Sequence, residues 1–404
     1  MGAVAIGASP TRAATTSSRF DHVVVVMMEN RSFDHLLGWL PGADGRQAGL
    51  TFTDAAGVAH ATHPLAPDMQ GCAHPDPDHS YAGGRAELNG GAADGWLRAG
   101  TNDDYAIGYY GQTDLPFLGR AAPHWTTFSR YFAPILAETY PNRIYMHAGQ
   151  TDRVTNTTKV SRLPTIWDRL AKAGVSGRYY FSDVPILALW GTRYLRISRP
   201  VAGFMAQAAA GTLPSVSFVD PRFIDEGSGT SRDYHPHADI RNSEQFMARI
   251  YRAVTRSPNW RRTVLIFTFD EWGGFFEHVP PPIGPIPPAD AAAGNQDGRR
   301  GFRVPCVMVS PFARRSHVAT DVYDHTSILR MIEARWSLRP LTVRDRTANN
   351  LGRELTASPK LDAPQFDVVG GPFGAACPPP PATPPTEETF APILQLARRR
   401  GWPV

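Results

Sequence analysis

Residues 22–30 read His-Val-Val-Val-Val-Met-Met-Glu-Asn, and this stretch decides the fold. A second stretch of the same design, residues 263–271, reads Thr-Val-Leu-Ile-Phe-Thr-Phe-Asp-Glu. Short apolar runs bounded by polar and glycine residues are typical of buried strands in a largely parallel sheet. Ligands of open α/β sheets bind just beyond the carboxyl ends of such strands. We therefore expect the two polar ends to meet at one edge of one sheet.

The rest of the chain alternates between strand and helix patterns, which predicts an α/β fold with a mostly parallel central sheet and flanking helices. Further strands are expected at residues 178–181, 215–219 and 304–311. Amphipathic spacing predicts helices at residues 165–174, 243–255 and 327–336. Residues 40–120 are rich in Gly, Ala and Asp, which indicates long loops with a few short helices around the site.

The ends of the chain differ from its middle. Residues 1–19 resemble the apolar region and cleavage site of a secretory signal peptide that lacks its basic N-terminal region. The alternative interpretation is a disordered N-terminus. Residues 377–404 contain a proline-rich, stiff linker followed by a short terminal helix. A disulfide between Cys72 and Cys377 is compatible with an oxidising compartment, whereas Cys306 lies in an apolar run that predicts a buried thiol.

Composition argues against a nucleic-acid partner and against a transmembrane segment. Hydrophobic residues make up 42% of the 404 residues and charged residues 19%, as in a globular protein with a full core. A net charge of +4 is too small at this length to indicate nucleic acid. We also expect no transmembrane segment, because no stretch approaches the ~20 apolar residues that span a bilayer.

The two polar strand ends supply only oxygen ligands, from Glu29, Asn30, Asp270 and Glu271. Such ligands suit a hard or borderline divalent metal ion, whose identity stays open. One acidic pair at a strand end is more often a helix cap or the start of a loop. Two pairs, each after an apolar strand, favour a metal site.

Histidines form a second group, in polar loops beside Asp, Pro and Gly. A single histidine in such a loop is usually a surface or capping residue. Several together fit a site that binds an anion and moves protons near neutral pH. The members of this group are His79, His235, His237, His278 and His325.

A hydroxyl group could complete the site. Thr151 follows a glycine-bearing turn, from which its Oγ1 could reach a metal and an incoming phosphorus. Threonines at such turns are more often helix caps, and Ser32, Thr155 and Thr157 are competing candidates.

Six motifs, taken in their order along the chain, give a specific resemblance. They are residues 28–35 (MENRSFDH), 141–143 (PNR), 165–170 (TIWDRL), 268–279 (TFDEWGGFFEHV), 301–305 (GFRVP) and 323–327 (YDHTS). They resemble the bacterial phospholipase C and acid phosphatase family of phosphoesterases, from about residue 20 to about residue 355. The resemblance implies an alkaline-phosphatase-like α/β fold, with residues 20–376 as the catalytic domain.

The resemblance also implies roles for individual residues. Glu29, Asn30, Asp270 and Glu271 would hold the metal, with Thr151 as both ligand and nucleophile. His79 and His235 would contact the phosphoryl group or the leaving group. His278 and His325 lie in the same motifs and complete the expected catalytic set. The chain departs from the family at Tyr234 and Glu277, where many members have Asp before the histidine.

The implied activity is metal-dependent hydrolysis of phosphate esters, with phospholipase C-type cleavage of phospholipids through a phospho-threonine intermediate as the first hypothesis. A broad-specificity phosphomonoesterase is the alternative, and a non-catalytic secreted binding protein of the same fold is a third. A phospholipid substrate implies transient contact with a membrane surface, for which the loops at residues 115–118 and 280–288 are candidates. The family also implies a secreted or periplasmic protein.

Overall fold

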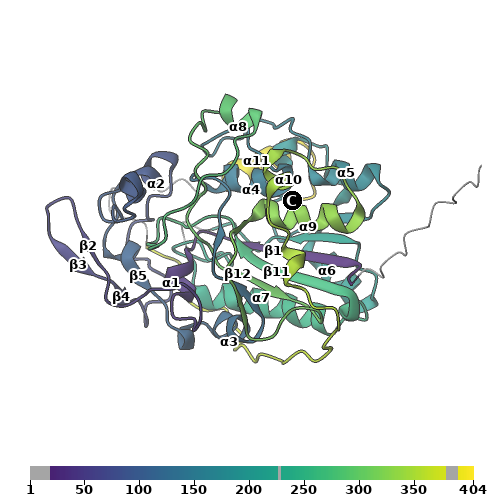
Figure 1. Cartoon of the computed structure of the whole chain (residues 1–404), viewed down its shortest axis with the longest axis horizontal. Coiled ribbons are helices and arrows are strands. Elements are labelled where there is room, and N and C mark those ends of the chain that lie inside the picture. Colours follow the sequence, from purple (N-terminus) through teal and green to yellow (C-terminus); the bar gives the residue numbers. More distant parts are fainter. Residues whose placement is uncertain (1–18, 226–228, 379–389) are drawn as a thin grey trace, which may run out of the picture.

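The computed structural model describes residues 19–225, 229–378 and 390–404 (Figure 1). Its central sheet has eight strands in the order β13-β6-β12-β11-β1-β10-β8-β9. The two apolar stretches form β1 (His22–Met28) and β11 (Thr263–Phe269), which are neighbours in the middle of this sheet. They run parallel, with Met28 opposite Phe269, so that both polar ends emerge at the same edge. The first prediction is confirmed.

The remaining strands extend the sheet on both sides. On one side, β10 (Val216–Val219), β8 (Gly177–Phe181) and β9 (Ser198–Pro200) continue the parallel pairing. On the other side, β12 (Cys306–Val309) is antiparallel to β11 and to β6 (Thr126–Phe128), and β13 (His317–Ala319) is parallel to β6. The sheet is therefore mostly parallel, as predicted, with a mixed edge.

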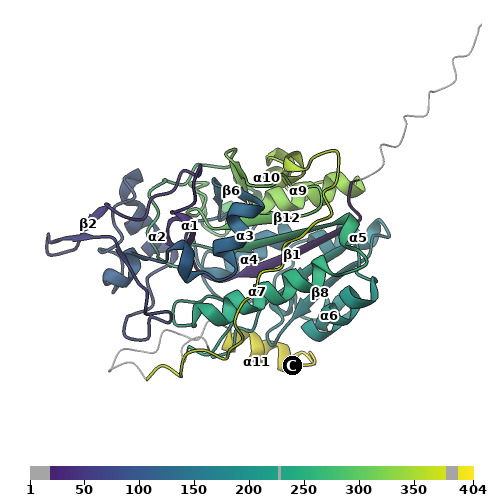
Figure 2. The ribbon, with the colours of Figure 1, turned by 90° about the horizontal axis from the view of Figure 1, so that it is seen from below.

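Helices cover both faces of the sheet (Figures 1 and 2). One layer contains α4 (Thr139–Ala148), α5 (Ile166–Lys172), α9 (His325–Trp336) and α10 (Val343–Thr347). The opposite layer contains α3 (Leu118–His124) and α7 (Ile240–Thr255), and α6 (Val201–Ala210) packs beside α7. The three helices predicted from amphipathic spacing correspond to α5, α7 and α9. Their N-caps are Thr165, Asp239 and Asp324, whose side chains accept backbone N–H groups.

Residues 40–120 contain more regular structure than their sequence indicates. Beside α2 (Tyr81–Leu88), they form β2 (Thr51–Thr53) paired with β3 (Ala59–Ala61), and β4 (His63–Pro64) paired with β5 (Gly108–Tyr109). Another small pair joins β7 (Tyr131–Phe132) to β14 (Tyr323–Asp324). Strands of two or three residues are too short to produce a periodic pattern, so sequence analysis missed them.

Three short helices complete the description: α1 (Phe33–Leu37), α8 (Pro288–Ala292) and the terminal α11 (Ala391–Arg399). The terminal helix was expected, and its Ile393 and Ala397 belong to the same core cluster as β1. Residues 1–18 and 379–389 lie outside the described residues, and so do the expected signal remnant and most of the expected linker. In the part of the chain that the structure describes, no helix has the length and apolar character needed to cross a bilayer.

A disulfide joins Cys72 to Cys377, with a Cα–Cα distance of 5.3 Å. It ties the segment that follows α10 to the loop that carries His79. The third cysteine, Cys306, is a buried free thiol in β12, as expected.

His147 is a core histidine whose protonation opposes folding. His147 of α4 lies against the rings of Trp167 and Phe218, at centroid distances of 5.8 and 4.9 Å. Its Nδ1 is buried and has no hydrogen-bond partner among the described residues. Burial, assisted by the nearby charge of Arg143, lowers the pKa of His147 to about 3.

This shift predicts acid sensitivity with a defined sign. Between pH 6.5 and 3 the unfolded chain binds a proton at His147 that the folded chain does not, so the free energy of unfolding decreases as the pH falls. We expect His147→Phe to remove this contribution, which amounts to about 2 kcal/mol at pH 5 relative to pH 7.5. Urea denaturation of both proteins at the two pH values measures it. An equal loss in the variant and the parent protein would contradict the assignment.

Candidate active site

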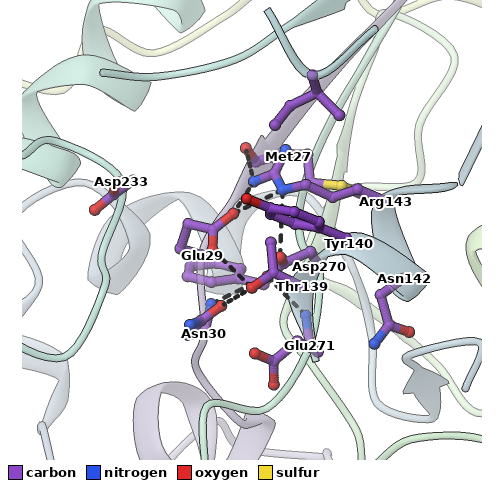
Figure 3. Close-up of polar contacts among 12 residues, drawn as sticks. Met27, Glu29, Asn30, Thr139, Tyr140, Asn142, Arg143, Asp233, Asp270 and Glu271 are labelled. Carbon is purple, nitrogen blue, oxygen red and sulfur yellow. Dashed lines mark hydrogen bonds and ion pairs between the residues drawn. The ribbon is translucent and has the colours of Figure 1, made fainter. Parts of the chain in front are cut away.

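The four predicted oxygen ligands meet beyond the ends of β1 and β11. Glu29, Asn30, Asp270 and Glu271 are all fully buried. One atom of the Asn30 side-chain amide lies 2.9 Å from Glu29 Oε2, 3.0 Å from Glu271 Oε1 and 3.2 Å from Asp270 Oδ1 (Figure 3). The backbone N–H of Asn30 donates to Asp270 Oδ1 at 3.1 Å. The two strand ends therefore form one cluster of oxygen atoms, as expected.

Thr139, which sequence analysis missed, supplies the hydroxyl of this cluster. Its Oγ1 lies 3.3 Å from Glu29 Oε2 and 3.4 Å from Asn30 Oδ1 (Figure 3). Thr139 is the first residue of α4, a helix of ten residues. The first N–H groups of a helix have no partner within it and carry partial positive charge, so an anion bound beside Thr139 would be stabilised.

The structure contradicts the placement of Thr151 in this cluster. Thr151 lies three residues beyond the other end of α4, which spans about 15 Å. Its N–H donates to Asp290 Oδ1 at 3.0 Å, and its hydroxyl donates to the carbonyl oxygen of Arg153 at 2.9 Å. Of the competing candidates, Ser32 caps α1. Thr155 and Thr157 flank Asn156, whose Oδ1 accepts the N–H of Tyr140 at 2.8 Å at the start of α4. The motif at residues 141–143 was the available signal, because Thr139 precedes it by two residues.

Arg143 was also missed as a site residue, although it belongs to a quoted motif. Its side chain is 2% exposed and lies one helical turn after Thr139. Arg143 Nε donates to Glu29 Oε1 at 2.7 Å and to Asp270 Oδ2 at 3.3 Å, while Nη1 donates to Asp220 Oδ1 at 3.1 Å. One guanidinium thus orients three carboxylates at the edge of the sheet.

The charges of the cluster are not balanced by Arg143. Burial raises the pKa values of Glu29 and Glu271 well above their ordinary range, and for Glu29 the charge of Arg143 only partly opposes this effect. Neighbouring carboxylates raise both pKa values further, Asp270 among them. Buried carboxylates of this kind are stable as anions only beside additional positive charge. The electrostatics of the cluster therefore favour a bound cation.

The donor set fits a divalent metal ion. Glu29, Asp270 and Glu271 offer carboxylate oxygens, Thr139 offers a hydroxyl, and Asn30 can turn its amide oxygen toward the carboxylates. With that amide orientation, four oxygen atoms face one another, which is a ligand arrangement for Mg²⁺, Mn²⁺, Ca²⁺ or a borderline ion. With the opposite orientation, the amide donates hydrogen bonds to the same carboxylates.

His79 and His235 lie beside this cluster. His79 Nε2 is 3.9 Å from Glu271 Oε1, and its Nδ1 donates to the carbonyl oxygen of Pro77 at 2.9 Å. The His79 and His235 rings are 6.4 Å apart between centroids and nearly perpendicular. Among the described residues, neither ring nitrogen of the buried His235 has a hydrogen-bond partner. Two imidazoles with uncommitted nitrogens are thus available beside the oxygen cluster.

An acidic residue from another loop approaches His235. Asp76 Oδ2 lies 3.4 Å from His235 Nε2, and both side chains are at least nine-tenths buried. The hydroxyl of Tyr234, the residue that replaces the family's Asp, donates instead to Glu244. Burial lowers the pKa of His235 to about 3, and the charge of Asp76 opposes this shift. Asp76 therefore stands as the carboxylate partner that Tyr234 cannot provide.

The backbone that presents His235 is held from several sides. Tyr234 has φ = 83°, a conformation that is strained for a bulky residue. Arg31 Nε donates to the carbonyl oxygen of Tyr234 at 2.7 Å, and the Tyr105 hydroxyl donates to that of Pro236 at 2.6 Å. These bonds stabilise the strained turn, so the backbone that presents His235 is held in place.

His278 and His325 do not join the cluster directly. His278 Nδ1 contacts Asp34 Oδ2, within a separate buried network that includes Glu277 and Arg303. Burial lowers the pKa of His278, but Asp34 and Glu277 outweigh it and the net shift is upward. His325 Nε2 donates to the carbonyl oxygen of Asp270 at 2.9 Å, and burial lowers its pKa to about 4. His325 therefore supports Asp270 as a neutral donor, and the catalytic roles expected of His278 and His325 stay predictions.

The remaining histidine of the predicted group, His237, lies next to His235, with ring centroids 6.4 Å apart. Its Nε2 donates to the carbonyl oxygen of His74 at 3.0 Å. This bond links the loop that carries His235 to the loop that carries Asp76 and His79.

Comparisons with known proteins identify similar sequences and structures. A family model described as the Phosphoesterase family matches residues 20–339. Phospholipase C A of Mycobacterium tuberculosis is 31% identical to the chain, covering 83% of it and 76% of the relative. Non-specific phospholipase C6 of Arabidopsis thaliana is 28% identical, covering 85% of the chain and 74% of the relative. A solved structure of a Vibrio parahaemolyticus protein in the alkaline phosphatase superfamily aligns with a TM-score of 0.42 and 9% identity, over 83% of this chain and 71% of that one.

The donor set predicts a measurable metal affinity. We expect the protein to bind a divalent cation in isothermal titration calorimetry, and Glu271→Gln to weaken this binding by at least about 100-fold because a ligand and a charge are lost. Glu244→Gln is the control, since Glu244 is equally buried but accepts the N–H groups of Phe117 and Leu118. Unchanged affinity in Glu271→Gln, or an equal loss in both variants, would contradict the assignment.

Proposed function

The chain belongs to the phosphoesterase family, and we propose that it is a metal-dependent phosphoesterase that cleaves phospholipids as a phospholipase C does. The observation that carries this proposal is the convergence of the Thr139 hydroxyl with the buried oxygens of Glu29, Asn30, Asp270 and Glu271 at the start of α4. A nucleophile, a cation site and a helix N-terminus at one point match the needs of phosphoryl transfer.

Thr139 replaces Thr151 as the proposed nucleophile. A divalent cation held by the oxygen cluster would lower the pKa of this hydroxyl and withdraw charge from the phosphoryl oxygens. The Oγ1–H of Thr139 points at Glu29 Oε2, which accepts the proton as Oγ1 attacks phosphorus. The new Oγ1–P bond forms as the bond from phosphorus to the alcohol oxygen breaks, which gives a phospho-threonine.

His79 and His235 are the proposed proton carriers. The departing alkoxide needs a proton, and an imidazolium beside the oxygen cluster can supply it. The negative charge of a bound phosphoryl group, together with Asp76, favours the protonated form of His235 against the effect of burial. In the second step, the neutral imidazole takes a proton from water, which attacks phosphorus as the Oγ1–P bond breaks, and the proton held by Glu29 returns to Thr139 Oγ1.

A phosphodiester of a membrane lipid is the proposed substrate because the similar proteins are named phospholipase C. Such a substrate requires transient contact with a membrane surface. The Cys72–Cys377 disulfide supports a secreted or periplasmic location, since disulfides persist in oxidising compartments. We propose no nucleic-acid partner for this reaction.

A direct assay tests the proposed reaction. Purified protein supplied with divalent cations is expected to release diacylglycerol and phosphocholine from phosphatidylcholine, and a chelator is expected to abolish this activity. Release of phosphate from p-nitrophenyl phosphate, measured in parallel, tests the phosphomonoesterase alternative. If the monoester were hydrolysed and the phospholipid were not, the phospholipase proposal would be rejected and the phosphoesterase assignment kept.

Two threonines at opposite ends of α4 test the nucleophile. Thr139→Ala is expected to reduce kcat by about 1,000-fold or more because no hydroxyl remains beside Glu29. Thr151→Ala is the matched control and should keep kcat within about threefold, since its hydroxyl bonds the backbone of Arg153 and not the oxygen cluster. Mass spectrometry of acid-quenched enzyme should find the phosphorylated residue at Thr139. Loss of activity in Thr151→Ala alone would reverse the assignment.

The proposed partnership of Asp76 with His235 predicts a change in pH dependence. Asp76→Asn removes a charge that raises the pKa of His235. We expect kcat to fall by about 10- to 100-fold and the alkaline limb of its pH profile to move to lower pH. Asp78→Asn is the control, because Asp78 lies in the same loop but accepts the N–H of Ser80. A fall in kcat with an unshifted pH profile would show that Asp76 is only structural.

A further inference from the structure

Residues 279–296 form a projection with no exposed charged side chain, which we call the 279–296 hairpin. None of its residues has a role in the proposed reaction. Among these 18 residues, Asp290 is the one ionisable residue, and it is fully buried. At the chain's average of 19% charged residues, about three would be expected. Ile283 is 62% exposed and Ile286 is 38% exposed. The helix α8 of this hairpin stands at the edge of the molecule (Figure 1).

Hydrogen bonds to the adjoining residues 298–300 hold the backbone of the 279–296 hairpin. The N–H of Gly284 donates to the carbonyl oxygen of Gly298 at 2.8 Å, and that of Arg300 donates to Pro282 at 3.1 Å. The guanidinium of Arg299 donates to the carbonyl oxygen of Pro281 at 2.9 Å, and that of Arg300 donates to Ile283 at 3.0 Å. The isoleucines are thus displayed on a backbone that needs no ordering when it binds a partner.

The 279–296 hairpin is bonded to both catalytic segments. The hydroxyl of Tyr81, two residues after His79, donates to the carbonyl oxygen of Gly294 at 3.3 Å. At the base of the hairpin, the N–H of Leu136, three residues before Thr139, donates to Arg299 at 3.3 Å. A surface that the hairpin contacts would therefore lie next to the walls of the site.

We propose that the 279–296 hairpin docks this protein on a phospholipid bilayer. This inference rests on the proposed function, because a phospholipase substrate lies in such a surface. Exposed isoleucines and prolines suit the boundary between head groups and acyl chains. The charged residues next to Ile283 are Arg299, which pairs with it across the hairpin, and Arg300, which donates to its carbonyl oxygen. The guanidinium of Arg299 at its base is partly exposed and suits a lipid phosphate, whereas that of Arg300 is held by Asp324 at 2.7 Å.

A proline-reading protein is a poorer occupant. Such domains bind an extended proline-rich segment whose backbone is free. Here the carbonyl oxygens of Pro281, Pro282 and Ile283 already accept hydrogen bonds from Arg299 and Arg300. The side chains of the hairpin are therefore free to contact a partner, whereas these backbone carbonyl groups are already hydrogen-bonded. This combination favours a lipid surface.

Vesicle binding tests the docking surface. Sedimentation with sucrose-loaded phosphatidylcholine vesicles is measured in a Thr139→Ala background, so that the lipid is not consumed. The double variant Ile283→Asp/Ile286→Asp is expected to bind at least tenfold more weakly than its parent. Val58→Asp is the matched control, because Val58 is 53% exposed on another hairpin, between β2 and β3, and should bind as the parent does.

Activity assays separate docking from chemistry. With Thr139 present, the double variant should hydrolyse soluble p-nitrophenyl phosphocholine at the parental rate but act on vesicles at least tenfold more slowly. Parental vesicle binding by the double variant, an equal loss in Val58→Asp, or a parent that does not bind vesicles would overturn the docking proposal. A parent that binds vesicles through the isoleucines and hydrolyses neither substrate would overturn the proposed function alone.

Discussion

The parallel, in-register pairing of β1 with β11 is the constraint on which the rest of the site depends. It places Met28 opposite Phe269, so Glu29 and Asn30 leave the sheet beside Asp270 and Glu271. Both strands are buried, so these acidic groups emerge where water does not reach them. Burial of several carboxylates at one point is unfavourable without compensating positive charge. The pairing that stabilises the sheet thus also creates the demand for a cation.

The surrounding elements meet only part of this demand, in two ways. Arg143 binds Glu29, Asp270 and Asp220 from the side of α4, and the N-terminus of the same helix adds partial positive charge at Thr139. Because Thr139 and Arg143 are four residues apart, one helix brings the hydroxyl and the guanidinium to the same cluster. His325 stabilises the cluster indirectly, because its Nε2 donates a hydrogen bond to the carbonyl oxygen of Asp270.

The histidine loops are ordered by long-range contacts. The Cys72–Cys377 disulfide and Gln70, whose Nε2 donates to Gly229 and Ala375 at 2.9 and 2.7 Å, join three segments that are far apart in sequence. Two of these segments carry His79 and His235. The proton carriers proposed for the reaction therefore depend on the C-terminal segment, although that segment contributes no side chain to the oxygen cluster.

The sequence by itself determined the α/β class, the two central strands and the four oxygen-bearing residues that end them, because uninterrupted apolar runs and the polar residues that follow them are local patterns. It also indicated His79 and His235 as residues of the candidate site. Only the tertiary structure placed Thr139, and not Thr151, beside these oxygens, since the two threonines lie at opposite ends of α4 and the sequence does not say which end faces the sheet edge. The same holds for Asp76, which reaches His235 from a loop about 160 residues away, and for His278, which pairs with Asp34. Such pairings depend on which loops the folded backbone brings together, and no local periodicity records them.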